Sequence, residues 1–177
     1  MQKKTLFISA GHSATDPGAV GNGYTEADIV LEFRDYLAEA LRARGVEFGK
    51  DGEPGQNLPL ATAWRMAAEH DIALEFHCNA AVSPGAAGVE TLSAPADMEL
   101  GLLICKAISE TLGIRNRGAK GEGSGQHSRL AFVSSGGGII VELFFISNAE
   151  DVAIYQRWKL QLAEVLADLL VEEVRRG

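Results

Sequence analysis

Two histidines and one glutamate stand at the ends of apolar segments that lie far apart in the sequence. Each comes directly after its segment: His12 after 6–11, His77 after 72–76 and Glu142 after 139–141. Such runs are typical of buried strands, and in open α/β sheets chemistry collects outside the carboxyl ends of parallel strands. Imidazole and carboxylate groups bind metals and carry protons. The pattern therefore indicates one chemical site assembled from distant parts of the chain.

A catalytic zinc site would need a third protein ligand besides the two histidines, with one position left open. Neither histidine has a His partner at helical spacing, so a carboxylate near the same strand ends must supply it. Glu26 is the best candidate, because it stands in the first turn of the helix after the His12 loop, where a helix N-terminus stabilises negative charge. Spacing alone leaves it equally open that Glu26 is a capping acid without a metal.

Glu142 needs a separate explanation, because residues 139–146 are otherwise apolar. Burying an unpaired carboxylate is expensive, so such a residue is usually paired or functional. Beside a zinc-bound water, Glu142 could take a proton and later pass it to a leaving group. The alternative is a salt bridge to Arg65 or Arg129. The burial argument favours the catalytic role.

The composition fits one ordinary soluble domain. The chain has 177 residues, of which 46% are hydrophobic and 23% charged, with a net charge of −8. The acidic balance, with no long basic stripe, argues against nucleic-acid binding. No segment has the roughly 20 apolar residues that span a bilayer, and the first residues do not form a signal peptide. We therefore expect synthesis in the cytoplasm and no membrane insertion.

Alternating strand and helix patterns predict an α/β layered fold with a largely parallel sheet. Thr25 is a predicted helix cap and Gly45 a predicted helix stop. No repeat or linker divides the chain. The expected strands are 4–9, a short 46–48, 72–76 and 88–92; the expected helices are 25–44, 60–70, 96–112 and 149–175; and the expected loops include 49–59 and 115–128.

With these residues in place, the chain resembles the zinc-dependent N-acetylmuramoyl-L-alanine amidases of the type-3 family. The similarity lies in several blocks that occur in order along nearly the whole chain. These blocks are 9–12, 16–19, Glu26, 76–80, 88–90, 116–120 and 141–148. Two departures concern the shape of the substrate groove: Phe144 stands where the family often has glycine, and 49–59 lacks a Thr-Arg turn that many members carry.

The resemblance implies a single three-layer α/β domain over residues 1–177, with a mixed, mostly parallel sheet flanked by helices on both faces. It implies that His12, Glu26 and His77 bind Zn²⁺ and that Glu142 acts as general base and acid. The reaction would be hydrolysis of the amide that joins the lactyl group of N-acetylmuramic acid to L-alanine in peptidoglycan. The zinc would polarise the carbonyl of that amide.

Four further residues are candidates for supporting roles. Asn79 could bind the peptide or orient a neighbouring group. Arg117 could meet acidic groups of the stem peptide, although a solvated loop is an equally good interpretation. His127 could contact substrate, but a solvated loop histidine is the simpler interpretation. Glu75 alternates with His77 on one strand, so it shares a face with that histidine and could be its hydrogen-bond partner.

The lack of a signal peptide and of a separate wall-binding domain favours a phage lysin that is made in the cytoplasm and reaches the wall through a holin-type lesion. Two alternatives remain open: a non-catalytic peptidoglycan-binding module, and another zinc peptidase of the same fold. The complete set of His12, Glu26, His77 and Glu142 argues against the first, since a binding module has no need of all four.

Overall fold

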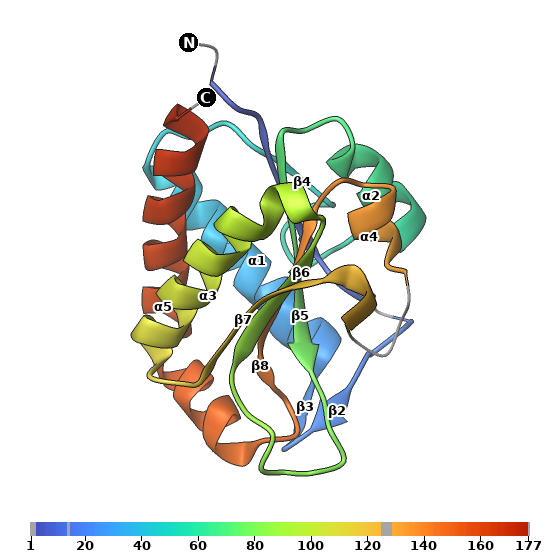
Figure 1. The fold of residues 1–177 in the computed structure, drawn as a ribbon, viewed down its shortest axis with the longest axis vertical. Coiled ribbons are helices and arrows are strands. Elements are labelled where there is room, and N and C mark those ends of the chain that lie inside the picture. Colours follow the sequence, from blue (N-terminus) through green and yellow to red (C-terminus); the bar gives the residue numbers. More distant parts are fainter. Residues whose placement is uncertain (1–2, 14, 125–128, 177) are drawn as a thin grey trace.

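The computed structural model describes residues 3–13, 15–124 and 129–176. These residues form a six-stranded sheet in the order β4-β1-β5-β8-β6-β7 (Figure 1). Strands β4, β1, β5 and β8 are parallel to one another, whereas β6 runs antiparallel to β8 and parallel to β7. The predicted mixed, mostly parallel sheet is therefore confirmed. Its strands are β1 Leu6–Ala10, β4 Gly49–Lys50, β5 Ile72–Asn79, β6 Val89–Ser93, β7 Asn116–Gly121 and β8 Ile139–Phe145.

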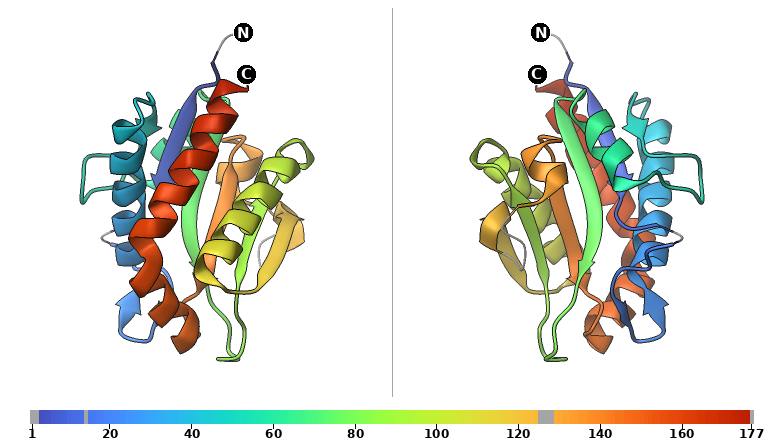
Figure 2. Two further views of the ribbon diagram at one scale, coloured as in Figure 1. Left: turned by 90° about the vertical axis from the view of Figure 1, so that its left-hand side faces the viewer. Right: turned by 90° about the vertical axis from the view of Figure 1, so that its right-hand side faces the viewer.

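Helices cover both faces of the sheet, which gives the predicted three layers. Three long helices lie side by side on one face with α5 in the middle, and two shorter ones lie on the other face (Figure 2). The larger apolar core packs under the long helices and a smaller one under the short helices. The long helices are α1 Glu26–Ala43, α3 Met98–Leu112 and α5 Ala149–Arg175; the short ones are α2 Leu60–Ala67 and α4 Ala131–Ser134. No helix in the described ranges is long and apolar enough to cross a membrane.

Two local predictions were wrong, each for a physical reason. The short strand lies at β4, beyond 46–48, because Gly49 and Lys50 are the residues in register with Phe7 and Ile8. Within the predicted loop 115–128, the described residues up to 124 contain strand β7 and the 3-10 turn Glu122–Ser124. β7 lies at the sheet edge and lacks the apolar alternation that marks a half-buried strand.

A small hairpin also lies inside the glycine-rich loop after β1. Strands β2 (Val20–Gly21) and β3 (Tyr24–Thr25) pair in antiparallel fashion. Asn22 and Gly23 connect them with φ of 51° and 85°. An Asn-Gly pair with two positive φ angles is the favoured two-residue hairpin turn, because its twist matches that of the flanking strands. The hairpin leads directly into helix α1.

A buried arginine ties helix α1 to the loop after β4. The Arg34 side chain is fully buried, and its Nη1 lies 2.8 Å from Oδ1 of Asp51, which is also fully buried. The same guanidinium donates to the backbone oxygens of Glu53 and Gln56. Burial raises the pKa of Asp51 to about 6, against the opposing effect of Arg34. Arg34 thus fixes the conformation of a loop that carries few apolar anchors.

We expect Arg34→Met to lower the free energy of unfolding by about 3–5 kcal/mol at pH 8, because it leaves the Asp51 carboxylate buried and without a cation. The folded-state pKa of Asp51 lies above its ordinary value of 3.8. The penalty for ionising Asp51 therefore applies above about pH 6 and fades as the pH falls. Urea unfolding at pH 8 and pH 5 measures both values.

The control is Arg42→Met, a change at an exposed position of the same helix. A loss for Arg34→Met no larger than for this control would contradict the role of the ion pair. An equal loss at the two pH values would show that packing, and not charge, is responsible.

Candidate metal and catalytic site

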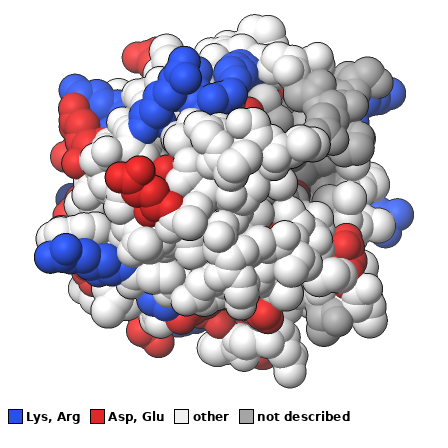
Figure 3. Space-filling view, turned by 90° about the horizontal axis from the view of Figure 1, so that it is seen from below, with Lys and Arg blue, Asp and Glu red and all other residues white. Residues whose placement is uncertain are grey.

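The residues predicted to do chemistry meet toward the carboxyl ends of β1 and β5, beside the middle of β8. Figure 3 shows this end of the molecule, where charged side chains of both signs lie mainly around an uncharged centre. A cavity of about 430 Å³ opens here, and His12, Glu26, His77 and Glu142 all line it. Strand pairing is the reason for this meeting: in the parallel register of β5 and β8, His77 lies directly opposite Glu142.

Three of these side chains are arranged as a set that could hold a metal ion. One carboxylate oxygen of Glu26, Oε1, lies 3.1 Å from Nε2 of His12 and 3.0 Å from Nδ1 of His77. The three possible ligand atoms all lie within 4.8 Å of one another. Two imidazoles and one carboxylate are a donor set used by catalytic zinc sites. The structure thus places together the three residues that were predicted as ligands.

Glu26 does not act as the cap of its own helix. That role belongs to Thr25, whose side chain accepts a hydrogen bond from the backbone N–H of Asp28. The Glu26 carboxylate instead accepts hydrogen bonds from the backbone N–H groups of Ala19 and Cys78, each at 2.9 Å. Burial alone would raise the pKa of Glu26, but hydrogen bonds from His12 and His77 outweigh it and hold the pKa far below its ordinary value. Glu26 is therefore a buried anion facing the cavity.

His12 is held in an unusual backbone conformation by a loop that is distant in sequence. Its φ of 61° lies in the left-handed region, which non-glycine residues rarely adopt. The side-chain amide of Asn57 donates to the backbone oxygens of His12, at 2.5 Å, and of Ala10. Asp51 accepts from the backbone N–H of Ala10. The Arg34–Asp51 pair thus also supports the loop that carries His12.

Sequence reasoning missed these supporting residues. Asn57 and Asp51 lie in a glycine- and proline-rich segment whose only local signal is that of a loop. Their function depends on contacts with residues more than 40 positions away. A polar residue in such a segment carries no local sign of its partner.

His77 is held from both sides of its ring. Its Nδ1 faces Glu26, and its Nε2 lies 3.0 Å from Oε1 of Glu75. Burial opposes a charge on this ring, but the hydrogen bonds to Glu26 and Glu75 raise the pKa of His77 well above its ordinary value. Gly11 packs against the same ring: a Cβ built there would lie within 2.7 Å of both ring nitrogens. A side chain at position 11 would therefore displace the ring.

Glu142 stands in the middle of β8 and has a carboxylate oxygen, Oε2, that is buried without a hydrogen-bond partner in the described parts of the chain. No salt bridge joins it there to Arg65, which lies over the Trp64 ring, or to Arg129, which donates to Ser134, so the alternative of a structural ion pair finds no support. Burial raises the pKa of Glu142 to about 7. A carboxyl group with a pKa in this range can both accept and donate a proton near neutral pH.

The proposed substrate residues have different surroundings. Asn79 lines the cavity and donates to Oε1 of Glu90 at 3.0 Å. Arg117 donates to Oε2 of Glu90 at 2.6 Å and lies over the Phe145 ring, outside the residues that line the cavity. A substrate contact by Asn79 or Arg117 stays a prediction. His127 lies outside the described residues.

Phe144, the departure next to Glu142, is buried on the side of the larger core. Its ring stacks on Tyr155 of α5, with 4.7 Å between the ring centroids. Successive strand residues point to opposite faces, so Phe144 would share a face with Glu142 in a regular strand. Phe144 and its neighbour Leu143 both pack in the larger core, which shows that the strand is irregular there. A register shift between β5 and β8 does occur between His77 and Asn79. The bulky ring therefore contributes to core packing under the helix layer.

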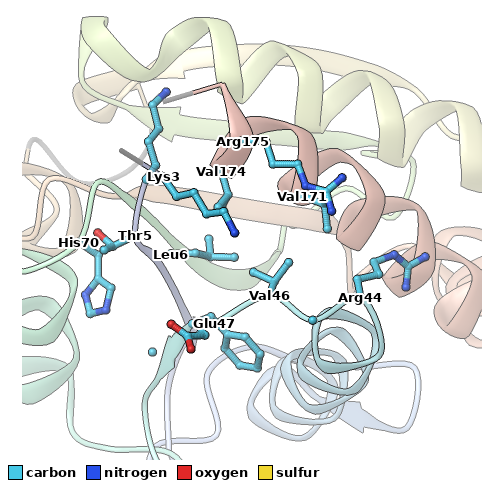
Figure 4. A pocket seen from close by; sticks show the side chains of 14 residues that line it. Lys3, Thr5, Leu6, Arg44, Val46, Glu47, His70, Val171, Val174 and Arg175 are labelled. Carbon is cyan, nitrogen blue, oxygen red and sulfur yellow. The ribbon is translucent and has the colours of Figure 1, made fainter. Parts of the chain in front are cut away.

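A larger cavity of about 530 Å³ lies elsewhere, next to the amino end of β1 (Figure 4). Lys3, Arg44 and Arg175 are among its lining residues. Arg44 and Arg175 stand at the C-terminal ends of α1 and α5, where cations balance the helix dipole, and Arg44 also pairs with Glu164 and Asp168. The positive charge of this cavity has a structural explanation. None of the four predicted chemical residues lines it.

Comparison with known proteins identifies the family. Residues 6–171 match the family model Amidase_3, N-acetylmuramoyl-L-alanine amidase. The chain belongs to this amidase family. A crystal structure of the putative N-acetylmuramoyl-L-alanine amidase from Neisseria meningitidis is 38% identical, with a TM-score of 0.88, and the match covers 97% of this chain and 96% of that one. The family resemblance and the fold predicted from sequence are therefore confirmed.

Two named relatives extend beyond the region that matches this chain. The amidase LytC of Bacillus subtilis (strain 168) is 28% identical over 185 residues, which cover 97% of this chain and 36% of LytC. The endolysin of Bacillus phage SPP1 is 28% identical over 166 residues, covering 87% of this chain and 59% of the endolysin. The chain thus spans about a third of the length of LytC.

If the His12–Glu26–His77 group holds zinc, we expect Gly11→Ala to weaken its zinc affinity about 10–100-fold, because the new methyl group pushes the His77 ring away from its partners. Titration with zinc against a chromophoric chelator measures the affinity, and circular dichroism checks the fold.

Gly121→Ala is the matched control, because a Cβ there meets nothing within 4 Å. Equal zinc affinity of the Gly11→Ala variant and this control would contradict the fit between Gly11 and His77.

Proposed function

We propose that this chain is a zinc-dependent N-acetylmuramoyl-L-alanine amidase, which hydrolyses the amide between the lactyl group of N-acetylmuramic acid and L-alanine in peptidoglycan. Family membership supports the reaction class and the substrate. The observation that carries the proposal is the juxtaposition of the His12–Glu26–His77 group with the unpartnered carboxylate of Glu142 in one cavity. We infer that the sheet and its helices act as the catalytic domain.

The side chains present fit a zinc ion. His12 Nε2, His77 Nδ1 and one carboxylate oxygen of Glu26 would hold it, and their convergence needs no further protein ligand. When bound, zinc supplies Lewis acidity toward the amide carbonyl and favours ionisation of water. The negative charge of Glu26 offsets part of the charge of a divalent cation in this half-buried site. The remaining room in the cavity is available to the substrate.

Glu142 moves the proton in this proposal. Its carboxylate takes a proton from the attacking water and passes it to the amide nitrogen, so that the amine of L-alanine leaves as a neutral group. Both steps need an oxygen atom that no other protein group engages, and Oε2 of Glu142 meets this need among the described residues. The raised pKa of Glu142 lets the protonated form persist until the C–N bond breaks.

A phage lysin is the finer proposal for the biological role. Its support is the similarity to the SPP1 endolysin, although the probable autolysin PH of Staphylococcus aureus (strain NCTC 8325 / PS 47) is 27% identical, almost the same value. Expression in a bacterial host with and without a holin distinguishes a phage lysin from an autolysin. Lysis that depends on the holin supports the lysin, and lysis without it contradicts release through a holin-type lesion.

We expect Glu142→Gln to lower the rate of wall hydrolysis about 10²–10⁴-fold, because glutamine cannot carry the proton. Loss of turbidity of isolated walls measures the rate. Zinc content should stay equal to that of the wild type, since Glu142 is not a ligand. Glu39→Gln, at an exposed position of α1, is the control. Hydrolysis by Glu142→Gln at the rate of the control would refute the proposed role.

We also expect that a zinc chelator abolishes hydrolysis and that added zinc restores it. Analysis of the soluble products tests the bond that is cut. An amidase releases free N-terminal L-alanine and creates no new reducing sugar ends. New reducing ends would mean a glycosidase, and cleavage between two amino acids would mean a peptidase. Activity that survives complete zinc removal would overturn the metal-dependent mechanism.

A further inference from the structure

Glu75 lies two residues before His77 on β5, and the two side chains meet on one face of the sheet. Oε1 of Glu75 is 3.0 Å from Nε2 of His77. We propose that Glu75 is a positioning residue for the metal site, which holds Nε2 of His77 so that Nδ1 faces the metal. This inference rests on the proposed zinc-dependent function and concerns a residue that does not itself touch the metal or the substrate.

The surroundings of Glu75 offer its carboxylate few partners other than His77. Its side chain is only 3% exposed, in a strand whose neighbouring residues are apolar. No Lys or Arg of the described chain pairs with it within 4 Å; its partners are the His77 ring and Oγ of Ser9, at 3.3 Å. Burying a carboxylate without a cation is expensive. The hydrogen bond to His77 is the contact that accounts for a charge at this position.

Ser9 fixes the other half of the carboxylate. It lies opposite Glu75 in the parallel register of β1 and β5, and its hydroxyl donates to Oε2 of Glu75. Oε1 is thereby left to face the histidine. The carboxylate is anchored between two adjacent strands, so its orientation follows from the sheet itself and not from a mobile loop.

The anchored carboxylate of Glu75 determines which of the two nitrogens of the His77 ring carries the hydrogen. The backbone of Gly11 lies against the ring edge that carries both nitrogens, and the two carboxylates lie beyond that edge on either side. A hydrogen on Nε2 that is donated to Glu75 leaves the lone pair of Nδ1 directed toward Glu26 and His12. Without Glu75, either nitrogen could carry the hydrogen. Fewer molecules would then present Nδ1 as a ligand.

The other ligand histidine provides an internal comparison. Nδ1 of His12 lies 3.1 Å from Oδ2 of Asp16, the same kind of contact, but the Asp16 side chain is 67% exposed. Water can replace an exposed hydrogen-bond partner at little loss, whereas it cannot replace a buried one. The two contacts are alike in chemistry and differ in burial. Asp16→Asn is therefore the matched control for changes at Glu75.

The test measures zinc affinity by competition with a chromophoric chelator, using zinc alone as the probe. Glu75→Ala removes both the acceptor and the charge, and we expect it to weaken zinc binding about 10–100-fold. Glu75→Gln keeps an acceptor but loses the charge, and should weaken binding less than Glu75→Ala. Asp16→Asn should weaken it least. Affinities of both Glu75 variants equal to that of Asp16→Asn would overturn the proposal.

A second measurement uses the unaltered protein and does not depend on how the variants fold. Nitrogen NMR of the zinc-loaded wild type should show His77 bound through Nδ1, with a hydrogen on Nε2. Binding through Nε2 would overturn the proposal. A wild-type protein that binds no zinc or does not hydrolyse walls would instead overturn the proposed function. Failure confined to the Glu75 comparison, with an active zinc-loaded wild type, overturns the positioning role alone.

Discussion

The site depends on one buried carboxylate that several segments of the chain share. Glu26 accepts hydrogen bonds from the backbone after the His12 loop and from the backbone of β5, and its Oε1 faces both His12 and His77. A buried anion of this kind is tolerable only while its partners stay in place. Helix α1, strand β5 and the loop between β1 and β2 are therefore held in one arrangement. A cation in the cavity would replace the protons that otherwise balance Glu26.

The rest of the fold positions the two histidines around that carboxylate by different means. His77 needs little help from loops, because it lies in a strand paired on both sides, next to the side-chain-free backbone of Gly11. His12 lies beyond the end of its strand in a left-handed conformation, and a remote loop holds it through Asn57. That loop is fixed in turn by the buried pair of Arg34 and Asp51. Stability of helix α1 and geometry of the metal group are thus linked.

The sequence allowed the layered fold and the four central residues to be predicted, because both leave local signals. Apolar runs mark strands, and Glu142 is conspicuous as a charge within one of them. The edge strand β7 and the clamp of Asn57 on His12 were missed for the opposite reason. An edge strand need not alternate between apolar and polar residues, and a clamp is defined by its distant partner. The pairing of Arg117 with Glu90 was not predictable either, because it joins two strands that only the folded chain brings together.

The buried carboxylates near the site differ in whether other side chains contact them. This difference separates the residues that hold the site in place from the residue that can transfer a proton. Glu26 is engaged by both histidines, Glu75 by His77, and Glu90 by Arg117 and Lys120. These three carboxylates are fixed by their contacts, and moving a proton through any of them would break the arrangement. Glu142 retains a buried oxygen without a partner in the described chain. Because Oε2 of Glu142 takes part in no hydrogen bond among the described residues, a change in its protonation breaks no contact that holds the site. The residue that is least satisfied in the resting structure is therefore the one best able to carry a proton.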